Sequence, residues 1–219
     1  MWCIQEITPE YRERMYRLLD LYKAKPDSTR PVICMDEKSK QLIEDIRKLI
    51  AASQGSCEKY DYEYRRNGTC NIFMAIAPKA GIRIVKVTQT RGKADFAYFI
   101  RNLLAVHFPK ARYIQLVLDN LNTHFENSIV ETFGKKEAAA ILKKVKFIYT
   151  PKHASWLNMA EIELNIMDRQ CTGGRMSSKE IVNSEVQKWA KGRNKKKCTI
   201  QWKFTRQDAD RKLSKHYVS

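Results

Sequence analysis

The apolar run at residues 113–118 is the feature that most limits how this chain can fold. A run of this kind is typical of a strand that is covered on both faces of a sheet. It ends abruptly in Asp119, and an earlier apolar run at residues 32–35 ends in the same way in Asp36. The two runs therefore predict buried strands that each carry an acid at one end.

The rest of the hydrophobic pattern alternates between strands and helices. It predicts further strands at 70–77, 82–88 and 145–149, of which the first two form a hairpin through a turn at 78–81. It predicts helices at 10–24, 93–108, 125–133, 137–144, 157–170 and 178–191. We interpret residues 41–52 as a helix or an irregular segment, and residues 199–218 as a short extended piece followed by a basic helix.

This order of elements predicts an α/β fold with a mixed central sheet of about five strands, flanked by helices on both faces. The ribonuclease-H-like fold has the same order. The sequence contains no internal repeat, low-complexity segment or obvious linker. We therefore expect residues 31–219 to form a single domain, preceded by a helical lead-in segment at residues 1–30.

The charge of the chain points to a polyanionic partner. The 219 residues include 41 Lys and Arg against 24 Asp and Glu, a net charge of +17, which favours nucleic acid. No apolar run approaches the roughly 20 residues of a membrane helix, and early acids exclude a signal peptide, so we expect a cytoplasmic protein without a membrane partner. The six cysteines never form a C-x-x-C pair, which argues against a zinc site.

Three acids predict metal-dependent chemistry on nucleic acid. Asp36 and Asp119 end two strands, and if these strands are parallel neighbours, both side chains emerge at one edge of the sheet. Two divalent ions about 4 Å apart can activate a water or hydroxyl and neutralise charge at phosphorus. Such ions need about three converging carboxylates. A helix packed across that edge would supply the third, Glu161.

Helical phase favours Glu161 over Glu163 as this third ligand. Asn158, Glu161 and Asp168 share one polar stripe of the predicted helix, whereas Glu163 falls on the opposite side. We expect Glu163 to pair with a basic neighbour or a helix end.

Five further residues are secondary candidates for the site. His124 and His153 could bind phosphate or assist proton transfer, or simply brace loops. Asn120 is better explained as holding its loop through side-chain hydrogen bonds. Asn158 lies on the stripe of Glu161. Glu37 follows Asp36 directly, so it would point elsewhere if the strand continued.

Basic and aromatic side chains form candidate DNA contacts. The basic segment 191–197 could contact phosphates or be a solvated loop, and the Tyr/Arg cluster at 60–66 could stack on bases or be a structural insertion. Trp156 could stack on a base, although we favour a role as an anchor in the core. The candidate DNA-binding side chains are Arg65, Arg66, Lys152, Lys191, Arg193, Lys195, Lys196 and Lys197.

Four segments closely resemble bacterial insertion-sequence transposases of the mariner-related DDE superfamily, and the resemblance covers nearly the whole chain. These segments are 36–42, 60–69, 118–124 and 149–164. The resemblance implies a ribonuclease-H-like DDE catalytic domain in which Asp36, Asp119 and Glu161 hold two Mg²⁺ (or Mn²⁺) ions. It also implies DNA cleavage at transposon ends, strand transfer into target DNA, commonly at a TA dinucleotide, and a homodimer assembled on DNA in the bacterial nucleoid.

Two departures from the family pattern bear on activity. The helix-turn-helix region that recognises element ends in these relatives does not precede Trp2, so we expect a catalytic part without it. The spacing between Asp119 and Glu161 is longer than in the wider mariner group, although it suits this bacterial branch. The alternatives are an inactive remnant that binds DNA non-specifically and a related ribonuclease-H-like nuclease.

Overall fold

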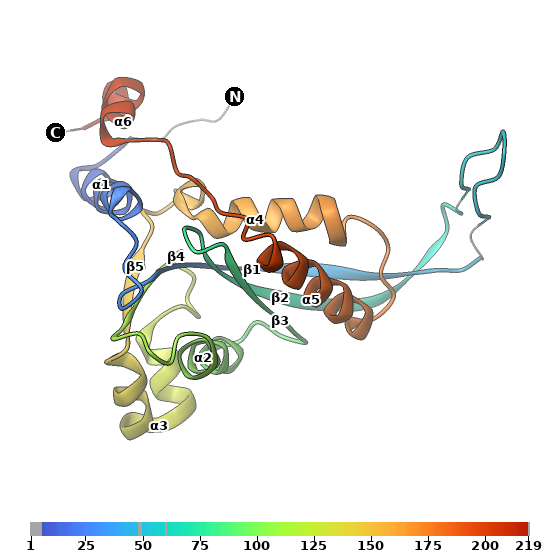
Figure 1. Ribbon diagram of the computed structural model, residues 1–219, viewed down its shortest axis with the longest axis horizontal. Coiled ribbons are helices and arrows are strands. Elements are labelled where there is room, and N and C mark those ends of the chain that lie inside the picture. The colour runs from blue at the N-terminus through green and yellow to red at the C-terminus, as the bar shows by residue number, and fades with distance from the viewer. Residues whose placement is uncertain (1–5, 48–49, 60, 219) are drawn as a thin grey trace.

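A five-stranded mixed sheet forms the centre of the protein (Figure 1). The computed structural model describes residues 6–47, 50–59 and 61–218. The strand order is β3-β2-β1-β4-β5; β2 runs antiparallel to its neighbours β3 and β1, whereas β1, β4 and β5 run parallel. The strands are β1 (Val32–Asp45), β2 (Tyr64–Ala77), β3 (Ile82–Thr88), β4 (Ile114–Leu118) and β5 (Val145–Tyr149).

Helices cover both faces of this sheet, as the sequence predicts (Figure 1). One face carries α1 (Pro9–Lys23), α4 (Met159–Met167) and α5 (Lys179–Lys195), with α6 (Arg206–Leu213) packed against α1. The other face carries α2 (Lys93–Asn102) and α3 (Glu126–Leu142). Short helical turns occupy Leu103–His107, Ser155–Leu157, Asp168–Thr172 and Ser214–His216. No helix among the described residues is long and apolar enough to cross a membrane.

Two hydrophobic clusters fill the space between the sheet and its helices. Successive side chains of β2 point to opposite faces of the sheet. Met74 therefore lies in the cluster under α1, α4 and α5, and Phe73 lies in the cluster under α2 and α3. Because Leu18 of α1 is fully buried in the first cluster, the lead-in helix shares its core with the sheet. The domain boundary between residues 30 and 31 stays a prediction.

Strands β1 and β2 form a hairpin that is much longer than the predicted strands at 32–35 and 70–77 indicate. β1 does not end at Asp36 but continues to Asp45, and β2 already begins at Tyr64. The expectation of a helix or irregular segment at 41–52 is therefore wrong for residues 41–45; residues 48 and 49 lie outside the described part of the chain. The two strands pair as far as Asp45 and Tyr64, and this backbone ladder needs no apolar alternation. We call this projecting hairpin, residues 41–69, the arm (Figure 1).

Most of the other predicted elements agree with the structure to within a few residues. The two helices expected at 125–133 and 137–144 form one element, α3, which is interrupted at Gly134, where φ is 75°. The expected helix at 157–170 is divided into a 3₁₀ turn, α4 and a π-helical turn, and α5 continues to Lys195 instead of ending at 191. The extended piece expected after residue 199 forms no strand in the described chain.

Candidate active site

Asp36 and Asp119 lie close together at the centre of the sheet. β1 and β4 are parallel neighbours whose last paired residues are Cys34 and Val117, and each aspartate follows two residues later. Side chains alternate along a strand, so Asp36 lies on the same face as Cys34, which is the face that α4 covers. The parallel arrangement that the sequence required for a shared site is therefore present.

The electrostatic surroundings disfavour a negative charge on Asp36. Burial raises the pKa of its carboxyl to about 7, although the Glu37 backbone N–H donates to Asp36 Oδ1 at 2.8 Å and favours the charged form. The nearby charges of Asp119 and Glu37 contribute to this increase in pKa, against the smaller opposing effect of His124. A divalent cation beside Asp36 would supply the positive charge that favours its ionised form.

His124 bridges two acids beneath this site. Its Nδ1 lies 2.6 Å from Asp119 Oδ1 and its Nε2 lies 2.7 Å from Glu37 Oε2, while the side chain itself is only 1% exposed. Burial lowers the pKa of His124, but hydrogen bonds to the two carboxylates outweigh this effect and raise it to about 9. Both ring nitrogens of a protonated imidazole donate, so the ring orients both carboxylates. Because β1 continues, Glu37 points to the α2 side and still reaches the site through His124.

Glu161 lies in the first turn of α4, at the start of which Asn158 forms the helix cap. Asn158 Oδ1 accepts from the Ala160 backbone N–H at 3.1 Å, and its Nδ2 donates to the Met35 carbonyl at 2.8 Å. Met35 directly precedes Asp36, so this cap fixes the start of α4 beside β1. Glu161 Oε2 is buried, and within the described part of the chain no group hydrogen-bonds to it.

Glu163 is turned away from the site and buried among positive charges. It forms ion pairs with Arg83 and Arg193, which confirms the prediction that it pairs with basic neighbours. Two residues along a helix rotate the side chain by about 200°, which explains why Glu161 and Glu163 have opposite surroundings.

The donor set of the proposed site suits a hard divalent cation. Magnesium and manganese prefer carboxylate oxygens, and both Glu161 Oε2 and Glu37 Oε1 are buried without a hydrogen bond from any described residue. In the described chain, however, no three His, Cys, Asp or Glu side chains stand close enough together to hold a metal ion. The assignment of Asp36, Asp119 and Glu161 as ligands therefore stays a prediction.

The loops around the acids are tied to the N-terminal helix. Asn120 Nδ2 donates to the Thr150 carbonyl at 2.7 Å, so Asn120 holds its loop as expected, and its Oδ1 accepts from Arg14 of α1 at 3.4 Å. Arg14 also lines a cavity of about 460 Å³ together with Lys152 and His153. Sequence reasoning missed Arg14, because no local signal links residue 14 to residue 120.

Trp156 is not an anchor in the core. Its side chain is 41% exposed and packs on the C-terminal tail, stacked at 6.4 Å from Trp202 and edge-on at 5.6 Å from Phe204. The core-anchor prediction is therefore wrong, because the side chain packs on these tail aromatics and stays partly exposed.

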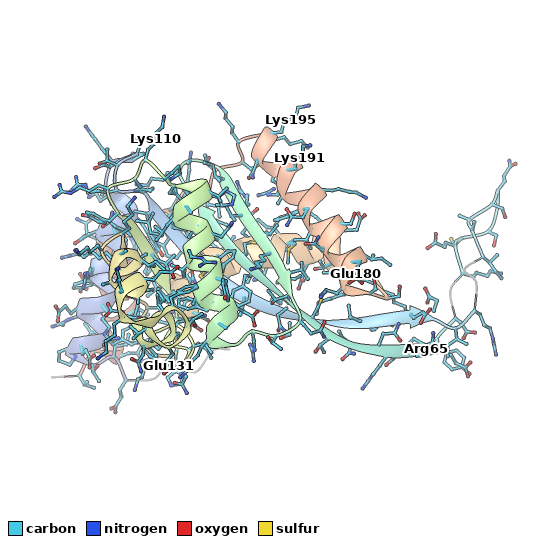
Figure 2. The ribbon with its side chains drawn as sticks, turned by 90° about the horizontal axis from the view of Figure 1, so that it is seen from below. Arg65, Lys110, Glu131, Glu180, Lys191 and Lys195 are labelled. Carbon is cyan, nitrogen blue, oxygen red and sulfur yellow. The ribbon has the colours of Figure 1, made fainter. Side chains whose placement is uncertain are left out.

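The candidate DNA-binding side chains are divided between three places. Lys191 and Lys195 are exposed on the C-terminal half of α5, and Arg65 lies on the arm, where it pairs with Glu44 (Figure 2). The third place is the loop of Lys152, which lines a cavity together with Arg14 of α1. Arg66, Lys196 and Lys197 are exposed, whereas Arg193 is turned inward to Glu163; Tyr60 of the Tyr/Arg cluster lies outside the described residues.

Comparisons with known proteins agree with this geometry. Residues 31–198 match the family described as DDE superfamily endonuclease. A structure of the Mos1 mariner paired end complex with Mn matches with a TM-score of 0.57 at 16% identity, over 90% of this chain and 60% of that chain. The Mos1 strand transfer complex matches with a TM-score of 0.57 at 15% identity, over 86% and 55%.

These structural matches confirm the predicted ribonuclease-H-like fold. The chain spans less than two thirds of the length of the Mos1 chains. No curated protein sequence matches it.

Proposed function

The chain belongs to the DDE superfamily endonucleases, and from this premise we propose that it is the catalytic domain of a DNA transposase. One observation carries the proposal: Asp36 and Asp119 follow paired residues of adjacent parallel strands, beside a helix whose first turn carries Glu161. We assign residues 31–219 to this domain and residues 1–30 to its lead-in. Its reactions would be hydrolysis at transposon ends and strand transfer into target DNA.

In this proposal Asp36, Asp119 and Glu161 hold two Mg²⁺ or Mn²⁺ ions. When bound, such ions activate the attacking oxygen and neutralise charge on the phosphate. The protein's own part is to orient the ligands. His124 holds one oxygen of Asp119, and Asn158 fixes α4 against the strand next to Asp36. Glu37 orients the His124 ring, which in turn holds Asp119, because Glu37 lies on the opposite face of β1 from Asp36.

The partner in this proposal is DNA, and charge is the main support for it. The net charge of +17 is large for 219 residues, and Lys191 and Lys195 are exposed on one helix (Figure 2). Contacts of this kind hold phosphates without reading sequence. We further propose a cytoplasmic, nucleoid-associated protein of a bacterium.

A homodimer on DNA is the second part of the partner proposal. The arm exposes large apolar side chains: Ile46 is 60%, Ile50 65% and Tyr62 82% exposed. Apolar groups gathered on a projecting hairpin are typical of a surface that a second protein covers. Two DNA ends must be joined in one complex, so a second copy of this chain is the occupant that fits the reaction.

Nicking of supercoiled plasmid DNA tests the proposed activity. We expect nicks in the presence of Mg²⁺ or Mn²⁺, and loss of nicking with EDTA or in Asp119→Asn, because the charge that holds the ions is removed. Asp27→Asn is the matched control, since Asp27 lies in a surface turn and pairs with Arg30. Cleavage that persists in EDTA would contradict the proposal.

A specific observation keeps the inactive DNA-binding remnant as a second candidate. The three acids do not stand in metal-binding positions among the described residues. DNA binding that falls steeply with salt, without any nicking, would favour the remnant. Preferential cutting of RNA–DNA hybrids would instead favour a related nuclease.

A further inference from the structure

A buried cluster of three charges lies on the far side of α4 from Glu161. The Glu163 side chain is 0% exposed and Arg83 is 1% exposed. Arg83 Nε donates to Glu163 Oε1 and its Nη2 donates to Oε2, both at 2.9 Å, which makes a bidentate pair. Arg193 joins from a second direction, with Nε 2.5 Å from Oε1 and Nη2 3.3 Å from Oε2.

This charge cluster joins three elements that are distant in the sequence. Glu163 belongs to α4, Arg83 to the edge strand β3, and Arg193 to the C-terminal end of α5. Asn194 strengthens the same junction, because its side chain accepts from the Arg83 backbone N–H at 2.7 Å and donates to the Arg83 carbonyl at 2.8 Å. Arg83 also donates to the carbonyl of Cys198, just after the basic segment.

The bidentate pair restrains the rotation of α4 in a way that apolar contacts do not. Leu164 and Met167 of α4 are buried in the hydrophobic core, but the hydrophobic effect that favours their burial is non-directional. A guanidinium fork on a carboxylate is planar and directional. Glu163 and Glu161 are two residues apart on one rigid helix, so any rotation that moves Glu163 also moves Glu161.

Stability alone is a weak reason for this arrangement. Replacing buried ion pairs by well-packed apolar side chains is often neutral or stabilising in proteins. The free energy of folding therefore does not explain why a buried carboxylate faces two guanidiniums here. The requirement that fits the position is orientation, because the same helix turn carries the proposed third metal ligand.

We propose that Glu163, Arg83 and Arg193 are positioning residues that set the rotation of α4 and aim Glu161 at Asp36 and Asp119. This inference rests on the proposed endonuclease function. Because Arg193 lies between Lys191 and Lys195, the same junction ties the rotation of α4 to the helix that we expect to contact DNA.

The test compares two ways of removing the charges. Glu163→Gln keeps the shape of the side chain but loses its charge. The triple variant Arg83→Met, Glu163→Leu, Arg193→Met replaces the whole cluster by apolar groups, so it keeps the experiment informative if Glu163→Gln folds poorly. Leu103→Ala is the control for general destabilisation, since Leu103 is buried in the other cluster, under α2 and α3. Lys93→Gln with Glu131→Gln removes an exposed ion pair as the surface control.

Four quantities are measured for each variant: the melting temperature, the dissociation constant for DNA, single-turnover kcat, and Mn²⁺ affinity from the free-ion electron paramagnetic resonance signal. A misplacement of about 1 Å costs on the order of 100-fold in rate. We therefore expect the triple variant to melt near the wild type and, at DNA concentrations well above its measured dissociation constant, to lose about 100-fold in kcat together with weaker Mn²⁺ binding.

The outcomes separate this inference from the proposed function. If the triple variant recovers wild-type kcat and Mn²⁺ affinity along with its melting temperature, the cluster only stabilises the fold and the inference is wrong. The inference is equally wrong if Leu103→Ala loses as much kcat as Glu163→Gln at an equal fall in melting temperature. If the wild-type protein itself neither nicks DNA nor binds Mn²⁺, the proposed function fails, independently of the cluster.

Discussion

A single imidazole, His124, connects two of the acids that the sequence singles out. Its ring lies between Asp119 and Glu37, and all of its polar atoms face carboxylates in a nearly closed environment. A protonated ring in this position places one positive charge between two carboxylates and leaves the second oxygen of Asp119 for another partner. At the scale of the residue, the site therefore consists of charged side chains that orient one another through hydrogen bonds.

Replacing His124 by Ala should destabilise the protein by about 2–4 kcal/mol, because the buried Glu37 carboxylate loses its partner. The free energy of unfolding from urea denaturation measures this change. His107→Ala is the matched control, since His107 is exposed, and we expect it to change stability by less than about 0.5 kcal/mol. An equal effect of the two substitutions would show that His124 carries no buried charge pair.

The start of α4 has two functions at the scale of the element. Asn158 satisfies a free backbone N–H of the helix and also bonds to the strand that carries Asp36. An ordinary cap performs only the first of these functions. Ser178, which caps α5 by accepting from the Ile181 N–H at 3.3 Å, is such a cap.

Asn158→Ala should therefore cost more than Ser178→Ala. We expect a loss of about 2–3 kcal/mol for Asn158→Ala, from a cap and a buried hydrogen bond, against about 1 kcal/mol for Ser178→Ala. Chemical denaturation measures both. The nicking rate should be lower in Asn158→Ala than in Ser178→Ala. Equal nicking rates in the two variants would show that the Asn158 cap does not affect the active site.

Charge acts at the scale of the whole molecule. The excess of 41 basic over 24 acidic residues attracts DNA from any direction, but phosphate contacts form only where lysines are exposed and unshielded. Lys191 and Lys195 meet this condition on the face of α5 (Figure 2). Lys135 and Lys136 are also exposed, on α3 at the opposite face of the sheet.

These two lysine pairs give a test of which face binds DNA. Replacing Lys191 and Lys195 by Gln should lower the slope of log Kd against log salt by about 2, because two phosphate contacts are lost. Replacing Lys135 and Lys136 should leave the slope unchanged. Fluorescence anisotropy of a labelled duplex at several salt concentrations measures both slopes. The reverse result would show that DNA binds at the α3 face.

Local sequence was a good guide wherever apolar periodicity was strong. Strands β3 and β5 have the predicted bounds, and Glu163 pairs with basic groups as its helical phase indicated. The arm was missed because its strand residues do not alternate between apolar and polar, and its strands are held by backbone hydrogen bonds that leave no hydrophobic pattern. The position of Trp156 was missed because its partner, Trp202, is distant in the sequence.

The order of the elements, the acids that follow buried strands, and the excess of positive charge can all be read from the amino-acid sequence. These are properties of neighbouring residues and of composition, so they exist before the chain folds. The folded chain adds three contacts that the sequence does not reveal: His124 links Asp119 to Glu37, Arg14 reaches Asn120, and Arg193 faces Glu163 instead of solvent. Each of these contacts joins separate parts of the chain, and its energy depends on burial, which packing alone provides.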